Sequence, residues 1–444
     1  MEIFRGTVLR YKGGGFEMIK DGIVAVEHGK IEFVEDARKM KSDKNGDVKF
    51  KGQLLKRSQL AILPPCANMH DHSFQPPGIP GELIYFDKKA GRLCGWLPTT
   101  LKEGELKAKT NHEAAGEMIR YKLKKFAENG IGTVLQYTTS SVETVSIVLE
   151  EGAKSGLRVI AGYVCMDQGI EDIRRGLQTS GEDAVRSTEF LLRMYGADKV
   201  AVIDRFPIAV SSDTRKKLAE LALKYGALYE THMDESVSEK NIHKSIYGTK
   251  SIARTLLNDG VFAGKGRVGL AHSIHTNASE MDLIHEKIGE GCKVFIRACP
   301  NSNGQLASHF KGDKYVEFPL QKWQSAGATI TFGTDQGAGR GWNIFGEMLD
   351  ERKRHPVARQ PSCLELLKYG TLNGHVSAGV DVKKTNIAVG NKAEFLVVKM
   401  AGASGFYDED DLPDNLEEAA ARVIEGAAFD EYILHFYLEG KRIY

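Results

Sequence analysis

The chain has 444 residues, 42% hydrophobic and 27% charged, which is enough for one large domain and a smaller one. Its formal net charge is only +1, from 60 basic and 59 acidic residues, which argues against nucleic acid or an anionic membrane surface as a partner. No apolar run approaches the roughly 20 residues that a membrane span requires.

The six cysteines are widely scattered and form no CxxC pair, so they indicate neither a disulfide framework nor a thiolate zinc site. The opening stretch MEIFRGTVLRYKGG has no basic segment followed by an apolar one, and the sequence therefore predicts no secretory signal. We expect a cytoplasmic protein.

Both ends of the chain are rich in predicted β-strands. Near the N-terminus, EIFRGTVLRY (2–11) is followed by DGIVAVEHGKIEFVED (21–36), in which HGK separates two short runs and predicts a hairpin. Near the C-terminus, NKAEFLVVKM (391–400) and YILHFYLEGKRIY (432–444) have the same character. We expect the two ends to pair into a small β-sandwich-like domain formed by residues 1–63 and 385–444.

The middle of the chain alternates apolar β-type runs with amphipathic helical stretches. Eight strands are predicted, at 60–69, 132–137, 158–164, 199–206, 227–233, 267–273, 292–299 and 328–335. Stretches between them carry apolar residues at helical spacing and end in glycine. This α/β alternation predicts a parallel sheet covered by helices, and eight units fit a closed (β/α)8 barrel of the TIM type over residues 64–384. A doubly wound open sheet is the alternative, but no GxGxxG follows an early strand.

Residues able to bind a metal ion stand at the carboxyl ends of these strands, where a barrel of this kind carries its chemistry. Strand one ends in MHDHSFQ (69–75), and its two histidines face the same side because side chains alternate along a strand. The strand-end residues are His70, His72, His232, Glu235, His272 and Asp335. Three of the histidines (His70, His72 and His232) and the aspartate predict a site for one divalent ion, zinc by preference and ferrous iron as the alternative.

Such an ion lowers the pKa of a bound water towards 7, which supplies hydroxide at neutral pH. Glu235 and His272 then remain for proton transfer, with His275 as the alternative to His272 if strand six ends later than expected. A lone histidine is usually structural, and Asp335 in GTDQG can simply shape a turn, so the prediction depends on four matches in chain order. The histidines that match no strand end are assigned to surface or structure: His112, His243, His285, His309 and His355.

Several segments resemble motifs of the amidohydrolase superfamily, in its aminohydrolase branch of deaminases and chlorohydrolases. They are PPCANMHDHSFQ (64–75), THMDES (231–236), LAHSIH (270–275), CPNSN (299–303) and FGTDQGAG (332–339). The resemblance covers nearly the whole chain. It implies that His70, His72, His232 and Asp335 bind the metal ion and that His272 holds and helps deprotonate the attacking water. It also implies that Glu235 protonates the ring nitrogen beside the attacked carbon and that Asp335 passes a proton to the departing amine.

Within that branch the chain resembles the guanine deaminases. Gln75 matches a glutamine of their first-strand motif, CGWLPTTLKEGE (94–105) resembles their tryptophan-leucine segment, and Arg205-Phe206 resembles an arginine-phenylalanine pair. The resemblance implies that Arg205 donates to the purine carbonyl oxygen and that Phe206 stacks on the ring, as suits a guanidinium and an aromatic face. We therefore expect a hydrolytic deaminase that converts guanine to xanthine. The resemblance also implies a homodimer.

The chain departs from the guanine deaminases at three places. Ala298 stands where these deaminases commonly have histidine, and the segments PPGIPGELIYFDKKAG (76–91) and GRGWNIFGEM (339–348) differ from theirs. The alternatives are therefore a hydrolase of another exocyclic group or ring: a chlorotriazine, a pterin, an oxidised purine or an adenosine derivative. The ring-opening members of the superfamily often hold two metal ions that are bridged by a carbamylated lysine. A two-metal site is not expected here, because Lys199 is the only lysine of strand four and stands at its start. A non-catalytic scaffold is disfavoured because the chain keeps every expected ligand.

Overall fold

The structure is a computed structural model that describes residues 1–75, 97, 98, 100–169, 176–306, 317–339, 341–402, 412–428 and 432–444. The predicted pocket segment at 76–91 and His309 lie outside these residues.

The strands are β1 (Glu2–Lys12), β2 (Gly15–Glu27), β3 (Lys30–Asp36), β4 (Val48–Phe50), β5 (Gln53–Leu55), β6 (Leu60–Leu63), β7 (Cys66–His72), β8 (Ile131–Tyr137), β9 (Arg158–Gly162), β10 (Val164–Cys165), β11 (Val202–Asp204), β12 (Leu228–Met233), β13 (Arg267–His272), β14 (Lys293–Ala298), β15 (Thr329–Phe332), β16 (Phe395–Lys399), β17 (Ile433–Leu438) and β18 (Lys441–Arg442).

The α-helices are α2 (Lys107–Thr110), α3 (His112–Glu128), α4 (Val142–Ser155), α6 (Gly181–Tyr195), α7 (Ser212–Tyr225), α8 (Val237–Tyr247), α9 (Ile252–Asn258), α10 (Ala278–Gly289), α11 (Pro300–Leu306), α12 (Leu320–Ser325), α13 (Ile344–Arg354), α14 (Cys363–Lys368), α15 (Gly374–Ser377) and α16 (Leu416–Ala427). Short 3-10 or π turns are η1 (Ala37–Lys39), η2 (Leu101–Leu106), η3 (Val357–Arg359) and η4 (Tyr369–Asn373).

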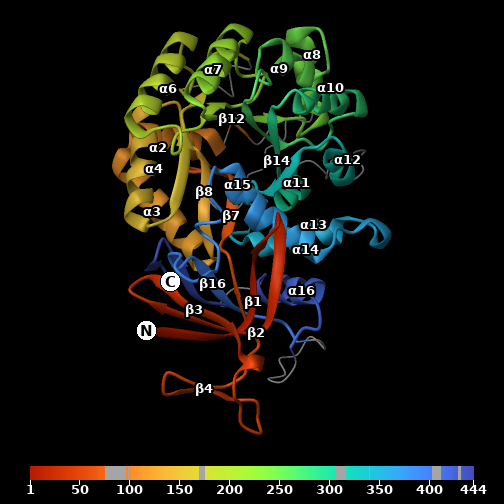
Figure 1. The fold of residues 1–444 in the computed structure, drawn as a ribbon. Coiled ribbons are helices and arrows are strands. Elements are labelled where there is room, and N and C mark those ends of the chain that lie inside the picture. The colour runs from red at the N-terminus through yellow and green to blue at the C-terminus, as the bar shows by residue number, and fades with distance from the viewer. Residues whose placement is uncertain are drawn as a thin grey trace.

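The two ends of the chain form one mixed seven-stranded sheet with the order β18-β17-β16-β6-β1-β2-β3. Both termini lie at this sheet, below the barrel in Figure 1. The predicted hairpin joins β2 to β3, with Glu27 paired to Lys30. Its turn uses His28 and Gly29 at φ of 49° and 75°, the left-handed values that a tight two-residue hairpin turn requires. β4 and β5 form a separate two-stranded hairpin, at the bottom of Figure 1.

The middle of the chain forms the parallel α/β barrel of the TIM type that the alternating pattern predicts. One sheet has the order β7-β8-β9 and the other β10-β11-β12-β13-β14-β15. A parallel bridge between Ala161 and Val200 joins the two sheets on one side. On the other side the Asp335 amide donates to the His70 carbonyl oxygen at 3.0 Å. Helices surround the strands, as Figure 1 shows.

The prediction of one strand over residues 60–69 is wrong. Residues 60–63 form β6, which lies between β16 and β1 in the terminal sheet, whereas β7 begins at Cys66 and lies in the barrel. Pro64 and Pro65 separate them, because proline lacks the N–H that a central strand donates to its neighbour. The chain therefore passes from one sheet to the other just before the two histidines.

The predicted helices begin and end at capping residues. Ser141, Ser180 and Ser211 precede α4, α6 and α7, and each serine side chain accepts a backbone N–H of the first turn. Gly156 and Gly226 end α4 and α7 in the left-handed conformation that favours glycine. Within the described ranges, no helix is long and apolar enough to cross a membrane.

A buried ion pair fills the barrel interior beneath the strand ends. Glu230 on β12 and Arg297 on β14 reach each other across Gly269 on β13, and the Arg297 guanidinium hydrogen bonds to the Glu230 carboxylate. A side chain at Gly269 would place its Cβ 2.0 Å from Glu230 Oε1 and would collide with the carboxylate. Arg297 Nη1 also donates to Ser377 Oγ at 2.5 Å, which ties α15 to the barrel.

Candidate active site

The two histidines of MHDHSFQ end strand β7, and the residue between them holds the strand in place. Asp71 points away from them, as alternation along a strand requires. Its carboxylate lies 2.7 Å from Lys122 Nζ and accepts from Gln136 Nε2 at 2.8 Å. Lys122 also donates to the His72 carbonyl oxygen. Buried charge-assisted contacts of this kind fix the direction in which His70 and His72 point.

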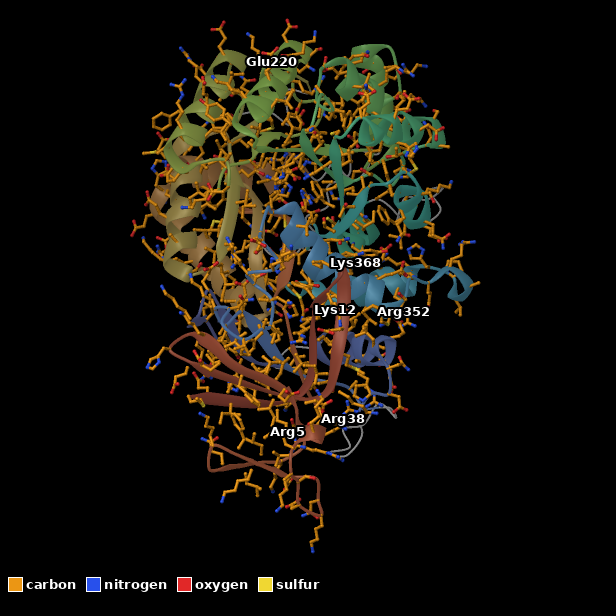
Figure 2. The ribbon with its side chains drawn as sticks, in the orientation of Figure 1. Arg5, Lys12, Arg38, Glu220, Arg352 and Lys368 are labelled. Atoms are coloured by element: carbon orange, nitrogen blue, oxygen red, sulfur yellow. The ribbon has the colours of Figure 1, made fainter. Side chains whose placement is uncertain are left out.

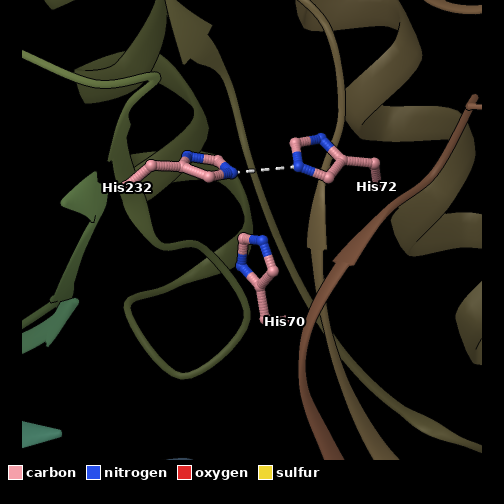
Figure 3. Close-up of side chains that lie close together, drawn as sticks. All are labelled: His70, His72 and His232. Carbon is pink, nitrogen blue, oxygen red and sulfur yellow. Dashed lines mark hydrogen bonds between the residues drawn. The ribbon is translucent and has the colours of Figure 1, made fainter. Parts of the chain in front are cut away.

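Three imidazoles from two strands converge on one point (Figure 3). His72 Nε2 lies 3.1 Å from Nε2 of His232, which stands on β12. One ring nitrogen from each of His70, His72 and His232 lies within 4.8 Å of the other two, and all three side chains are buried. His232 Nδ1 donates to the Arg205 carbonyl oxygen at 2.6 Å, so Nε2 keeps its lone pair for the centre of the cluster.

Asp335 completes the cluster from the turn that follows β15. Asp335 Oδ1 lies 3.7 Å from His70 Nε2 and 3.7 Å from His72 Nε2. The residue has a φ of 43°, a left-handed value that is uncommon for aspartate. Backbone strain of this type costs on the order of 1–3 kcal/mol and is found where surrounding contacts hold a functional side chain in position.

Gly333 allows β15 to approach β7 closely, and a side chain there would separate them. A Cβ at Gly333 would lie 2.5 Å from His70 Cβ and 2.7 Å from the His70 carbonyl oxygen. We expect Gly333→Ala to cost about 1–3 kcal/mol of stability, because the contact is with backbone that cannot rotate away. We also expect the metal affinity to fall about 10–100-fold, because the displaced imidazole loses its orientation.

Gly289→Ala is the matched control, because nothing lies within 4 Å of a Cβ at that position. Chemical unfolding and a metal titration in the presence of a competing chelator measure the two effects. Wild-type metal affinity in the Gly333→Ala variant would contradict the close packing of β15 on His70.

Two further groups, His272 and Glu235, lie beside the cluster. His272 Nε2 is 3.6 Å from Glu235 Oε2 and 3.9 Å from Asp335 Oδ2. The imidazole of His272 also forms a second group with His70 and Asp335 whose ligand atoms lie within 4.8 Å. His272 and Ser273 both have left-handed φ values, of 66° and 52°. The turn is held by Trp323, whose indole N–H donates to the Ser273 carbonyl oxygen at 3.2 Å.

Burial shifts the pKa values of the clustered histidines and of Glu235 in opposite directions. It lowers the pKa of His70 and His232 well below the usual range, and the neighbouring imidazoles lower it further, so both rings are neutral. Burial, followed by the charge of Asp335, raises the pKa of Glu235 well above its usual range. Neutral imidazoles are the form that binds metal ions, and a protonated carboxyl can donate a proton.

Glu105 is a site residue that the sequence did not single out. It lies fully buried on η2, with Oε1 3.7 Å from His72 Nδ1. Arg205 Nη1 donates to both of its oxygens, at 2.7 and 2.8 Å. Burial alone would raise the pKa of Glu105, but Arg205 and His72 lower it overall. Glu105 is the last residue of CGWLPTTLKEGE, the segment that resembles the guanine deaminases. That resemblance could have indicated a role for Glu105, but no chemical role was assigned to it.

The three expected substrate contacts lie in the same region of the barrel. Gln75 is buried, and its Oε1 accepts no hydrogen bond from the part of the chain that the structure describes. Phe206 packs in an apolar cluster that includes Leu101 and Ala338, from the segments that carry Glu105 and Asp335. Arg205, next to it, is occupied by Glu105 through Nη1.

The remaining histidines lie elsewhere. His243 and His285 pair with backbone carbonyl oxygens, of Thr249 at 2.7 Å and of Ala326 at 3.0 Å. His355 contacts two carboxylates, and His112 is exposed at the start of α3. The backbone N–H of His275 donates to the Asp234 carbonyl oxygen at 3.0 Å, which places this residue in the loop behind Glu235.

The cluster suits a divalent ion on the geometry of this chain. In the described ranges, neither ring nitrogen of the buried His70 has a hydrogen-bond partner. Two nitrogens bound to one zinc ion lie about 3.3 Å apart in tetrahedral geometry, close to the 3.1 Å between His72 and His232. A carboxylate oxygen of Asp335 supplies the negative charge that three neutral imidazoles lack.

The barrel and its buried histidine-aspartate cluster are typical of one enzyme family, and the chain belongs to it. The sequence profile of the amidohydrolase family matches residues 61–443. The chain is therefore a metal-dependent hydrolase of that family, acting on carbon–nitrogen bonds, the class that includes deaminases. The resemblance of the sequence motifs to this family is confirmed.

Two curated relatives and one solved structure illustrate the similarity. The chain is 26% identical to guanine deaminase of Escherichia coli K12 over 396 residues, which cover 86% of this chain and 82% of that protein. It is 25% identical to 5'-deoxyadenosine deaminase of Methanosarcina acetivorans over 395 residues, which cover 86% and 80%. The structure of guanine deaminase from C. acetobutylicum with bound guanine shares the fold, with a TM-score of 0.77, 22% identity and complete coverage of both chains.

Proposed function

We propose that this enzyme is a hydrolytic deaminase that converts guanine and water to xanthine and ammonia. The observation that supports it most directly is the position of Glu235, a buried carboxyl 3.6 Å from His272 Nε2 and beside the histidine-aspartate cluster. Removal of an amino group from an aromatic ring requires an acid for the ring nitrogen, an acceptor for the proton of water and a donor for the departing amine.

The proposed ligands of a single ion are His70, His72, His232 and Asp335, and their nitrogen and oxygen atoms suit zinc, with ferrous iron as the alternative. When bound, the ion lowers the pKa of a coordinated water towards 7 and so supplies hydroxide at neutral pH.

The residues of this chain then divide the proton transfers between them. His272 Nε2 accepts the proton of the attacking water, and Glu235 donates its proton to the ring nitrogen next to the attacked carbon. His272 passes the proton of water to Asp335, whose Oδ2 lies 3.9 Å from His272 Nε2, and Asp335 transfers it to the amino group, whose bond to carbon breaks as ammonia leaves. One water is consumed for each ammonia released, and Glu235 regains its proton from the new hydroxyl group as the product carbonyl forms.

Guanine is favoured among the possible rings by the proposed substrate contacts. The hydrogen bonds of Arg205 to Glu105 both use Nη1. Because a guanidinium has five N–H donors, Nε and Nη2 can serve the purine carbonyl oxygen. Gln75 offers a buried amide for a second polar edge, and Phe206 offers an aromatic face. The guanine deaminase relative from Escherichia coli supports the same substrate.

An adenosine derivative is the second candidate, because the 5'-deoxyadenosine deaminase relative is almost equally similar in sequence. Chlorotriazines, pterins and oxidised purines complete the set of alternatives.

A homodimer is also proposed, from the family resemblance. Light scattering coupled to size-exclusion chromatography measures the mass of the assembly in solution.

Product release from a panel of heterocycles tests the proposal, with ammonia measured for the amino-substituted rings and chloride for the chlorotriazine. The fully metallated enzyme is incubated with guanine, 2-aminopurine, 5'-deoxyadenosine, a pterin and a chlorotriazine. We expect guanine to give the highest kcat/KM, with xanthine as product, and 2-aminopurine to react more slowly because it lacks the carbonyl oxygen. A faster reaction with another ring would reject guanine, and no ammonia from any of them would reject the deaminase assignment.

A further inference from the structure

Two consecutive residues of α11, Ser302 and Asn303, contact two of the three groups that are proposed to move protons, Asp335 and His272. Ser302 Oγ donates to Asp335 Oδ2 at 2.5 Å. Asn303 Oδ1 accepts from His272 Nδ1 at 2.8 Å. Both side chains are buried, and both belong to the CPNSN segment, to which the proposed mechanism gives no role.

The two oxygens of Asp335 face different partners. Oδ1 lies 3.7 Å from His70 Nε2 and 3.7 Å from His72 Nε2, on the side of the proposed metal ion. Oδ2 lies 3.9 Å from His272 Nε2. The terminal torsion of an aspartate is broad, so the side chain alone does not fix which oxygen faces the metal ion and which faces His272. The hydrogen bond from Ser302 holds Oδ2 on the side of His272.

The contact with Asn303 selects one tautomer of His272. An amide oxygen can only accept, so Nδ1 of the neutral ring carries the hydrogen and Nε2 carries the lone pair. Nε2 is the nitrogen that lies 3.6 Å from Glu235 Oε2 and 3.9 Å from Asp335 Oδ2. With the opposite tautomer, a hydrogen would occupy Nε2 and the ring would be unable to accept the proton of water.

We propose that Ser302 and Asn303 act as one positioning unit for proton transfer. The hydrogen bond from Ser302 orients Asp335 so that Oδ1 faces the metal ion and Oδ2 faces His272, where it can transfer a proton. Asn303 keeps His272 in the tautomer that accepts a proton at Nε2. The unit is built from neighbouring residues of one helix turn, so the two groups are fixed relative to each other. This inference rests on the proposed function, because it assigns a task to His272 and Asp335 within that reaction.

Substitution of Asn303 by leucine removes the acceptor with little change in volume. We expect kcat to fall about 10–100-fold, the usual effect of removing the partner of a metal-site residue, with KM and metal content nearly unchanged. Asn303→Asp keeps an acceptor for Nδ1, and Ser302→Thr keeps a hydroxyl donor for Oδ2, so both should retain more of kcat than Asn303→Leu and Ser302→Ala.

Asn301→Leu is the matched control on the same helix. Asn301 Nδ2 donates to Asp350 Oδ2 at 2.9 Å on α13, away from His272 and Asp335. This variant should disturb the packing of α11 while leaving kcat within about twofold of the wild-type value, by the additivity expected for independent sites. An equal loss of kcat in Asn301→Leu and Asn303→Leu would overturn the proposal, because it would reduce both to a packing effect.

The tautomer of His272 is measured without turnover, by nitrogen-15 NMR of the histidine rings in the metallated protein. The His272 signal is the one that disappears in His272→Asn. We expect a hydrogen on Nδ1 in the wild type and a shift towards Nε2 in Asn303→Leu. A hydrogen on Nε2 in the wild type would overturn the inference. Absence of ammonia release from every substrate, with the Nδ1 tautomer intact, would instead reject the proposed function.

Discussion

The Glu235→Gln variant is expected to lose between about 100-fold and 10,000-fold in kcat/KM for deamination, the contribution of one positioned proton donor. Glutamine has nearly the shape of the protonated carboxyl but cannot release a proton to the ring nitrogen. Glu235 is 3% exposed, and its pKa is raised by burial and then by the charge of Asp335, which favours the protonated form of the native side chain. Steady-state ammonia release at saturating metal measures the change.

Two measurements separate this effect from damage to the site. The metal content of Glu235→Gln should equal that of the wild type, because Glu235 is outside the proposed ligand set. Glu220→Gln is the matched control, since Glu220 is an exposed carboxylate on α7 at the outside of the barrel (Figure 2). A Glu235→Gln enzyme that retains more than a tenth of the wild-type kcat/KM would remove Glu235 from the role of acid.

The Arg297→Met variant should be destabilised by about 3–5 kcal/mol, because it leaves the Glu230 carboxylate buried without its cation. Both side chains are fully buried in the barrel interior. Burial raises the pKa of Glu230 even though the charge of Arg297 opposes that shift. The midpoint of urea unfolding, followed by circular dichroism and combined with the slope of the transition, gives the change in stability.

The double variant Arg297→Met with Glu230→Gln should recover part of the loss, because the uncompensated charge is removed. Arg254→Met on the exposed face of α9 is the control and should change stability by less than about 0.5 kcal/mol. If Arg297→Met is no less stable than Arg254→Met, the ion pair does not stabilise the barrel.

The parts of the site that follow from local periodicity could be predicted from the sequence. His70 and His72 are two residues apart on a strand, so they face the same side whatever the surrounding fold. His232 and His272 stand at the ends of β12 and β13, where apolar runs give way to polar residues. These signals required only the strand period and the rule that barrels carry their chemistry at strand ends.

The parts that depend on contacts between distant segments could not be predicted in this way. Glu105 reaches His72 from η2, a π-helix that the sequence pattern did not predict, and its pairing with Arg205 joins residues 100 positions apart. The contact of Asn303 with His272 depends on how α11 packs after β14. The division of residues 60–69 between two sheets was signalled by Pro64 and Pro65, but an apolar run on both sides concealed it.

Every proposed role in this site depends on one divalent ion held by His70, His72, His232 and Asp335. Anomalous diffraction at the zinc absorption edge, from crystals of the zinc-loaded protein, tests it most directly. We expect one peak for each chain, bounded by Nε2 of the three histidines and by Asp335 Oδ1. No peak between these atoms in a fully active preparation, or a second ion beside the first, would contradict it.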